Sequence, residues 1–301
     1  MEKHQGSPVE EVKDQLTKGS GIRLLIKRDD LIHEHISGNK WRKFKYNLSE
    51  AIQQNHHTIL TFGGAYSNHI AATAFACKKA GLESIGVIRG EDDPGNPTLI
   101  FACEHGMRLE FVSREDYRRK ADDDFMHELE TRFGRFFLIP EGGANGLGVR
   151  GCAEILPEIT EDFDVVCSAA GTGTTLAGLI LSLKQGQRSI GFPALKGGEF
   201  LKDDVVRLVT ESRLKHGLLH VDLETNYHFG GYAKMKPELL EFISGFTERT
   251  GIPLDPIYTG KMMFGIYDLI MKGHFKKGTT VLAIHTGGLQ GWEGMRHRGL
   301  I

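Results

Sequence analysis

Short apolar runs alternate with longer segments of helical periodicity along most of the chain. The runs Ile59–Phe62 and Val165–Cys167 show no polar alternation, which is typical of strands that are covered on both faces. Such runs predict strands at Arg23–Lys27, Thr58–Phe62, Ser84–Ile88, Arg108–Val112, Phe136–Ile139, Asp164–Ser168, Ser189–Phe192 and Thr279–Ile284. The intervening periodicity predicts helices such as Lys40–Gln53, Asn68–Lys79, Pro97–Glu104, Leu147–Ile159, Thr174–Leu183 and Met262–Met271. This order indicates an α/β fold of βαβ units with mainly parallel sheets.

The length and charge of the chain restrict its class. At 301 residues, the chain is long enough for one large α/β domain or for two smaller ones that share a cleft. Its 37 Lys and Arg residues nearly balance its 39 Asp and Glu residues, which leaves a formal net charge of −2. This balance argues against a protein that binds nucleic acid.

The apolar and cysteine patterns predict a cytoplasmic protein that has no membrane segment. Met1–Ser20 is polar and lacks the apolar core of a signal peptide, and the longest apolar stretch, around Leu176–Leu183, is too short to span a bilayer. The cysteines are scattered without a CxxC pair, so we expect buried thiols in a reducing compartment at Cys77, Cys103, Cys152 and Cys167. No carboxylate or Cys framework accompanies the paired histidines, so no metal site is expected.

Four glycine-rich or polar segments follow predicted strands. They are Gly63–Asn68, Glu141–Asn145, Ala170–Thr175 and His285–Gly288. In parallel α/β sheets, ligands bind beyond the carboxyl ends of the strands, where loops lead into helix N-termini. We therefore expect these segments to converge on one cleft.

The loop Gly171-Thr172-Gly173-Thr174-Thr175 follows an apolar strand and begins an apolar helix. Its glycines would let backbone N–H groups approach an anion, and the helix dipole favours negative charge there. The spacing matches neither the Walker P-loop nor GxGxxG. An ordinary strand-to-helix turn with a threonine N-cap explains the loop equally well.

Lys40 ends a Gly-Asn-Lys sequence at the start of an amphipathic helix. The helix dipole disfavours a lysine at this position. A desolvated Lys40 could have a lowered pKa and form an imine with a carbonyl cofactor. Alternatively, Lys40, Arg42, Lys43 and Lys45 form a solvated basic face. Nucleic-acid binding by these residues is a third interpretation, which the net charge disfavours.

Five motifs, in the order GNK-W-RK, GGAYSNH, GTGTT, DPIYTGK and HTGG, resemble those of the D-cysteine desulfhydrase and 1-aminocyclopropane-1-carboxylate (ACC) deaminase family. That family belongs to the tryptophan-synthase-β-like (fold type II) enzymes, which use pyridoxal 5′-phosphate (PLP). The resemblance extends from about Ile26 to Gly288 and implies an α/β fold. We expect two open twisted, mainly parallel sheet lobes with helices on both faces and PLP in the cleft between them. The small domain would be residues 50–144, and the large PLP-binding domain would be residues 1–49 plus 145–301. Because such enzymes are commonly homodimers, a homodimer is expected.

The resemblance also implies which residues hold the cofactor. Lys40 matches the family's lysine, which would hold PLP as a Schiff base. Asn68 matches the asparagine that would bind the PLP 3′-oxygen, and Ser67 would lie near the substrate carboxylate and could transfer a proton. The family's phosphate loop matches Gly171, Thr172, Gly173, Thr174 and Thr175. Relatives carry Gln where this chain has Tyr66, a position that helps to orient the substrate carboxylate.

Further residues would surround the cofactor ring. By the resemblance, Tyr258 would lie close to the ring, and Tyr232 matches a second active-site tyrosine. Thr259 would face the pyridine nitrogen, together with Thr286. ACC deaminases carry Glu at the position of Thr259, where it keeps the nitrogen protonated. Thr259 is a neutral hydroxyl that could donate a hydrogen bond to the nitrogen but cannot be its counter-ion.

The activity implied by the resemblance is that of a PLP-dependent lyase or deaminase. The substrate would be a small amino acid such as D-cysteine, which β-elimination would convert to an α-keto acid and ammonia. ACC deaminase and a serine or other amino-acid deaminase are alternatives of the same class. A non-catalytic protein that binds a phosphorylated metabolite is an alternative of a different class, but phosphate binding alone does not require Lys40.

Overall fold

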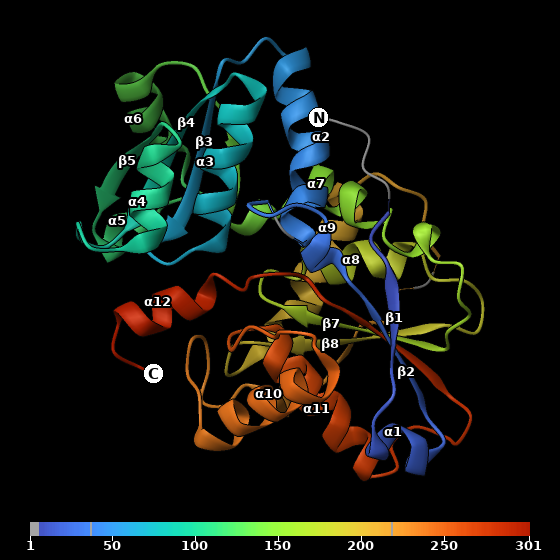
Figure 1. The fold of residues 1–301 in the computed structure, drawn as a ribbon. Helices are drawn as coiled ribbons and strands as arrows, with labels where there is room; N and C mark the ends of the chain where they lie inside the picture. The colour runs from blue at the N-terminus through green and yellow to red at the C-terminus, as the bar shows by residue number, and fades with distance from the viewer. Residues whose placement is uncertain (1–5, 37, 218) are drawn as a thin grey trace. The chain divides into compact units, whose positions relative to one another are not determined.

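The computed structural model describes residues 6–36, 38–217 and 219–301 of the protein (Figure 1). Within these ranges the chain forms two compact units. The smaller unit consists of Phe44–Ala144 and Gln290–Ile301. The larger unit consists of residues 6–43 and Asn145–Leu289.

The larger unit is built around a sheet with the strand order β1-β2-β10-β7-β8-β9. β1 pairs antiparallel with β2, and the other neighbouring strands are parallel. The strands are β1 (Val9–Val12), β2 (Arg23–Lys27), β7 (Val165–Ala170), β8 (Arg188–Pro193), β9 (Asp222–Leu223) and β10 (Thr280–Ile284). Because β7 and β10 are parallel neighbours, the Gly171 loop and the His285–Gly288 segment leave the sheet at the same edge.

Helices cover both faces of this sheet. α8 and α11 both pack against β7 and β8, and Figure 1 shows them on opposite faces. On the α8 face, Leu25, Val166 and Leu179 belong to one buried apolar cluster. The helices are α1 (Gln15–Ser20), α7 (Gly146–Cys152), α8 (Thr174–Leu181), α9 (Leu201–Glu211), α10 (Pro237–Thr250), α11 (Thr259–Met271) and the 3₁₀ helices η1 (Asp29–Leu31), η3 (Leu156–Glu158), η4 (Gly198–Phe200) and η5 (Thr225–Tyr227). Helix α2 (Asn39–Gln53) begins in this unit and ends in the smaller one.

The smaller unit contains a parallel sheet with the order β5-β4-β3-β6. Its elements are β3 (Thr58–Gly64), α3 (Asn68–Ala80), β4 (Glu83–Arg89), α4 (Pro97–Glu104), β5 (Met107–Val112), α5 (Arg114–Arg118), α6 (Asp123–Phe133), β6 (Phe137–Ile139), the 3₁₀ helix η2 (Glu141–Gly143) and α12 (Gly291–His297). Phe62 of β3 packs with Phe125 of α6. Ile88 of β4 packs instead with Ile70 of α3. Helices thus cover both faces of this sheet, as the lack of polar alternation predicted.

The predicted α/β class with two mainly parallel sheets is confirmed. Each predicted strand is present, with its ends shifted by two residues at most. The helix predicted for Leu147–Ile159 is wrong, because α7 ends at Cys152. Pro157 lacks the N–H that would bond the Ala153 carbonyl in a continued helix, and this carbonyl accepts the Ser182 hydroxyl instead (2.6 Å).

The two units differ from the predicted domain boundaries at two places. Residues 44–49 of α2 and the C-terminal segment Gln290–Ile301 group with the smaller unit. In that unit α12 packs against α4. Gly294 also lies so close to Tyr66 that a Cβ there would be 2.9 Å from the tyrosine ring. These contacts join segments that are distant in sequence, so local periodicity carries no sign of them.

All four cysteines lie in the described ranges as free thiols. The prediction of burial is confirmed for Cys77, Cys152 and Cys167 but is wrong for Cys103, which is exposed. Cys103 follows Ala102, which faces the core from α4, and the next helical position is turned away from that face. None of the helices in the described chain combines the length and hydropathy needed to cross a lipid bilayer.

Candidate active site

The Gly38-Asn39-Lys40 sequence is held against the segment that follows β10. The Gly38 N–H donates to the Asp29 carbonyl (2.9 Å), and the Asn39 N–H donates to the Thr286 carbonyl (3.3 Å). Gly38 has φ +64°, and a Cβ at this position would lie 1.8 Å from the Thr286 oxygen. Only glycine permits this approach. The sequence motif therefore places Lys40 in the first turn of α2, next to the HTGG motif.

Asn39 connects Lys40 with the glycine-rich loop. Lys40 Nζ donates to Asn39 Oδ1 (3.0 Å), and Asn39 Nδ2 donates to Thr175 Oγ1 (2.8 Å). The amide thus orients the lysine with its oxygen while its nitrogen reaches the first turn of α8. Three of the predicted segments, GNK, GTGTT and HTGG, meet at this point in the larger unit.

The surroundings of Lys40 lower the pKa of its amino group, which favours its action as a nucleophile. Burial and, to a smaller extent, the nearby positive charge of Lys43 lower the pKa of Lys40 to about 7, against the opposing effects of Cys152 and Asp255. Burial also lowers the pKa of Lys43. A lysine with such a pKa has a substantial neutral fraction near neutral pH, and the neutral amine is the form that attacks a carbonyl carbon.

The alternative of a solvated basic face is wrong. Of Arg42, Lys43 and Lys45, only Lys45 is exposed. The Arg42 guanidinium pairs with Asp29 (2.6 Å) and Glu158 (2.8 Å). These charges therefore fix the start of α2 from within the larger unit.

The glycine-rich loop joins β7 to α8. The N-cap of α8 is Gly173, with φ +77° and ψ −12°, so the predicted threonine N-cap is wrong. Among the described residues, no side chain caps this helix. Because the first N–H groups of a helix have no acceptor inside it, they remain suited to an anion. The Thr172 and Thr174 hydroxyl oxygens lie 2.9 Å apart beside them.

Tyr258 and Tyr232 lie next to this loop. A Cβ on Gly171 would be 3.1 Å from Tyr258 Cε1, so the Tyr258 ring lies against Gly171. The Tyr232 and Tyr258 rings meet edge to face, with centroids 6.1 Å apart. Tyr232 is 43% exposed. The two predicted tyrosines are therefore neighbours of each other and of the predicted phosphate loop.

Thr259 is buried, and its hydroxyl is engaged by Asp255. Thr259 Oγ1 donates to Asp255 Oδ2 (2.6 Å) and accepts the Asp255 N–H (2.9 Å). The Asp255 carboxylate also accepts the N–H groups of Ile257 and Thr259. Helix α11 begins at Thr259, three residues before the predicted Met262. Donation from Thr259 to a ring nitrogen, as predicted, would require its proton to leave Asp255.

Ser67 and Asn68 lie in the smaller unit, at the turn from β3 into α3. Ser67 is the N-cap of α3, and its Oγ accepts the His69 N–H (3.2 Å). His69 is buried, bonds Thr61 Oγ1 through Nε2 (2.8 Å) and stacks on Phe44. The SNH motif is thus anchored by its histidine, and Asn68 is the first residue of the helix.

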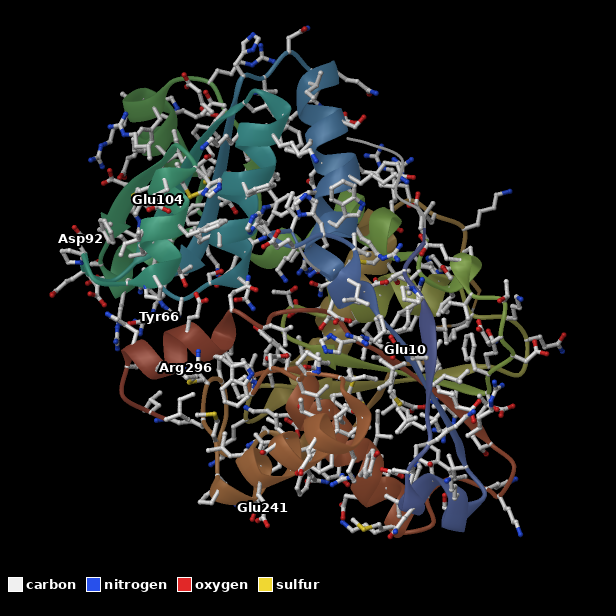
Figure 2. The ribbon with its side chains drawn as sticks, in the orientation of Figure 1. Glu10, Tyr66, Asp92, Glu104, Glu241 and Arg296 are labelled. Carbon is white, nitrogen blue, oxygen red and sulfur yellow. The ribbon has the colours of Figure 1, made fainter. Side chains whose placement is uncertain are left out.

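Tyr66 binds the C-terminal helix. Its hydroxyl lies 2.9 Å from His297 Nδ1 and 3.3 Å from Asp93 Oδ2, and the Arg298 guanidinium lies over its ring. Figure 2 labels Tyr66 beside α12, which also carries the labelled Arg296. Tyr66 is therefore part of the contact between the 63–68 turn and α12.

Several residues of this region were not assigned roles from the sequence. Asn39 and Lys43 lie within or near the GNK motif. Asn39 orients Lys40 through its contact with Thr175 of α8, and Lys43 lowers the pKa of Lys40 in a buried setting. In the part of the chain that the structure describes, no three His, Cys, Asp or Glu side chains are grouped to hold a metal ion.

Comparison with known proteins identifies relatives of the whole chain. Residues 4–287 match the family model described as pyridoxal-phosphate dependent enzyme. A protein of Pyrococcus horikoshii named "Putative 1-aminocyclopropane-1-carboxylate deaminase" is 35% identical over 92% of this chain and 87% of its own length. The mitochondrial bifunctional D-cysteine desulfhydrase/ACC deaminase of Arabidopsis thaliana is 33% identical over 90% of this chain and 74% of its own. The crystal structure of an ACC deaminase homologue, 31% identical, superposes with a TM-score of 0.85 over 98% of this chain and 94% of that one.

The chemistry of the site fits PLP. Lys40 supplies an amine of lowered pKa for the cofactor's aldehyde. The Gly171–Thr175 loop supplies backbone N–H groups at a helix start for its phosphate. Both groups belong to the larger unit and are joined through Asn39. The residues present therefore suit the cofactor that the family uses.

Proposed function

Because the chain belongs to the pyridoxal-phosphate dependent enzyme family, we propose that it removes ammonia from a small amino acid by β-elimination, with D-cysteine as the first candidate. Water and D-cysteine would give pyruvate, sulfide and ammonia. The observation that carries this proposal is Lys40, whose amine of lowered pKa is held beside an uncapped helix N-terminus. A non-catalytic phosphate-binding protein would have no use for that amine.

Bound PLP supplies an electron sink for charge that develops at the substrate's α-carbon. We assign to Lys40 the covalent attachment of the cofactor and the removal of the α-proton at Nζ. The phosphate would bind to the Gly171–Thr175 loop, that is, to Gly171, Thr172, Gly173, Thr174 and Thr175. Tyr258 and Thr286 would line the ring, where Thr286 is held by the contact of its carbonyl with Asn39.

The remaining assignments concern the substrate and the ring's outer contacts. We assign Asn68 to the cofactor's 3′-oxygen and Ser67 to the substrate carboxylate on the strength of the SNH motif. Tyr232 would orient the amino acid, because it adjoins Tyr258 and is partly exposed.

The choice of β-elimination over ACC cleavage rests on Thr259. A carboxylate at this position would be a counter-ion for a protonated ring nitrogen, whereas a hydroxyl is neutral. The Asp255 carboxylate, which accepts the Thr259 hydroxyl, is already engaged by backbone N–H groups. A weaker electron sink is adequate when a β-substituent leaves as the Cα–H bond breaks. It is less adequate for a cyclopropane that has no α-proton.

ACC deaminase is the second candidate. The name of the Pyrococcus relative favours it, and so does the similar crystal structure, which is that of an ACC deaminase homologue. The name of the Arabidopsis relative includes both activities. A serine or other amino-acid deaminase is a third activity that the same residues would support.

The deciding experiment is an assay of the purified holoprotein with both enantiomers of cysteine and serine and with ACC. We expect pyruvate from at least one β-substituted amino acid and little or no 2-oxobutyrate from ACC. A Lys40→Ala variant is the control for turnover by free PLP. Efficient ACC turnover with all four β-substituted amino acids inert would refute the argument from Thr259.

We also propose a cytoplasmic location and a homodimer. The free thiols of the four cysteines support a reducing compartment. The homodimer is proposed only because fold type II enzymes are commonly homodimers. Sedimentation analysis of the purified protein, which measures its molecular mass in solution, tests it.

A further inference from the structure

Lys261, of the DPIYTGK motif, is a buried cation that takes no part in the proposed chemistry. It lies in the first turn of α11, and its side chain is only 2% exposed. A buried ammonium group is costly unless all its donors are satisfied. The contacts of Lys261 therefore indicate what the charge is for.

Backbone carbonyls surround the Lys261 ammonium group. Nζ donates to the oxygens of Gly231 (2.8 Å) and His228 (2.9 Å) and approaches that of Ala194 (3.4 Å). An ammonium group has three N–H donors, so the three carbonyls match its capacity. Two of these carbonyls belong to the loop that carries Tyr232.

That loop has a backbone that needs external support. Phe229 and Ala233 have φ values of 53° and 52°, in the left-handed region that non-glycine residues rarely adopt, and Gly230 and Gly231 have φ values of 99° and 120°. Tyr232 lies between these residues and is 43% exposed. The conformation that turns Tyr232 toward Tyr258 is therefore held by contacts from outside the loop.

We propose that Lys261 is a positioning residue, whose ammonium group fixes the carbonyls of His228 and Gly231 and so sets the place of Tyr232 beside Tyr258. Burial lowers the pKa of Lys261 to about 8, against the opposing effect of the Asp255 charge. The Lys261 amino group is thus mostly protonated at neutral pH despite its burial. We call its contacts with the His228 and Gly231 carbonyls the clamp. The role assigned to Tyr232 rests on the proposed function, whereas the clamp itself does not.

The first test measures the loop without reference to activity. Hydrogen–deuterium exchange of the holoprotein is compared between the wild type and Lys261→Met, which keeps the length of the side chain and removes its charge and donors. Faster exchange at residues 228–233 is expected in Lys261→Met. The matched control is Lys236→Met, which removes an exposed lysine near the same loop and should leave exchange unchanged. Unchanged exchange in Lys261→Met overturns the clamp, whether or not the protein has the proposed activity.

The second test separates positioning from a general structural role. With the substrate identified by the amino-acid panel, Lys261→Met should lower kcat/KM by about 100-fold, as misplacement of an active-site group does, while visible absorbance shows that PLP remains bound. The same loss is expected in Tyr232→Phe and in the double variant. Additive losses, or full activity in Lys261→Met, would overturn the proposal.

Chemical rescue provides the sharpest readout. In Lys261→Ala, added ethylammonium or propylammonium should restore activity, because these ions return an N–H donor to the carbonyls. Tetramethylammonium, which has no N–H, should not. If Lys261→Met, Lys261→Ala and Lys261→Arg all fail to fold, Lys261 is required by the fold as a whole and the positioning proposal fails.

Discussion

Burial of Lys40 predicts that its amino group loses its proton near neutral pH. With the pKa of Lys40 at about 7, about three quarters of the amines are neutral at about pH 7.5, against about one in a thousand for a lysine with the usual value of about 10.4. The lowered pKa makes the neutral form dominant above about pH 7, and acidification below that value restores the charge. The predicted gain in reactive amine is therefore several hundredfold at neutral pH.

The assay is competitive labelling of the apoprotein with a trace amount of acetic anhydride between pH 6 and 11. Mass spectrometry measures the labelled fraction of the Lys40 peptide relative to a free lysine peptide in the same tube. We expect the Lys40 labelling rate to rise with a midpoint near pH 7. Lys43→Met should move this midpoint upward, and burial should keep it well below the free peptide's, because burial is the larger cause of the shift. A wild-type midpoint at the free peptide's value would refute the reasoning from burial.

Two further predictions concern single positions. Gly173→Val should weaken PLP binding by at least about tenfold, because a β-branched residue at φ +77° is strained by about 1–3 kcal/mol and its Cβ would lie 2.8 Å from Val205. The control is Gly186→Val, which has φ +88° and no described atom within 4 Å of the added Cβ. It carries comparable strain away from the loop and should leave the PLP dissociation constant unchanged. Equal PLP affinities in the two variants would place the phosphate elsewhere. Tyr66→Phe should lower the free energy of unfolding by about 1 kcal/mol and speed hydrogen exchange in α12, because it removes the hydroxyl that bonds His297 and Asp93. Unchanged exchange in α12 would show that the Tyr66 hydroxyl does not hold this helix.

Local pattern predicted eight strands of the described chain and most of the helices that it named, but it missed β1 and β9. The run Ile59–Phe62 shows no polar alternation, in agreement with the coverage of β3 on both faces. The periodicity placed the C-terminal end of α7 too late, because Pro157 lacks the N–H that would bond the Ala153 carbonyl in a continued helix. This carbonyl accepts the Ser182 hydroxyl instead.

The sequence by itself determined the α/β class from local periodicity, and it identified Lys40 as the candidate nucleophile through the resemblance of five motifs in order. Only the tertiary structure decided what those residues experience. Asn39 reaches Thr175 across 136 positions, and Tyr66 reaches His297 across 231. The lowered pKa of Lys40 arises from burial and from neighbouring charges. Burial of a charged side chain such as Lys40 is a property of the packed chain, and hydrophobic periodicity does not report it.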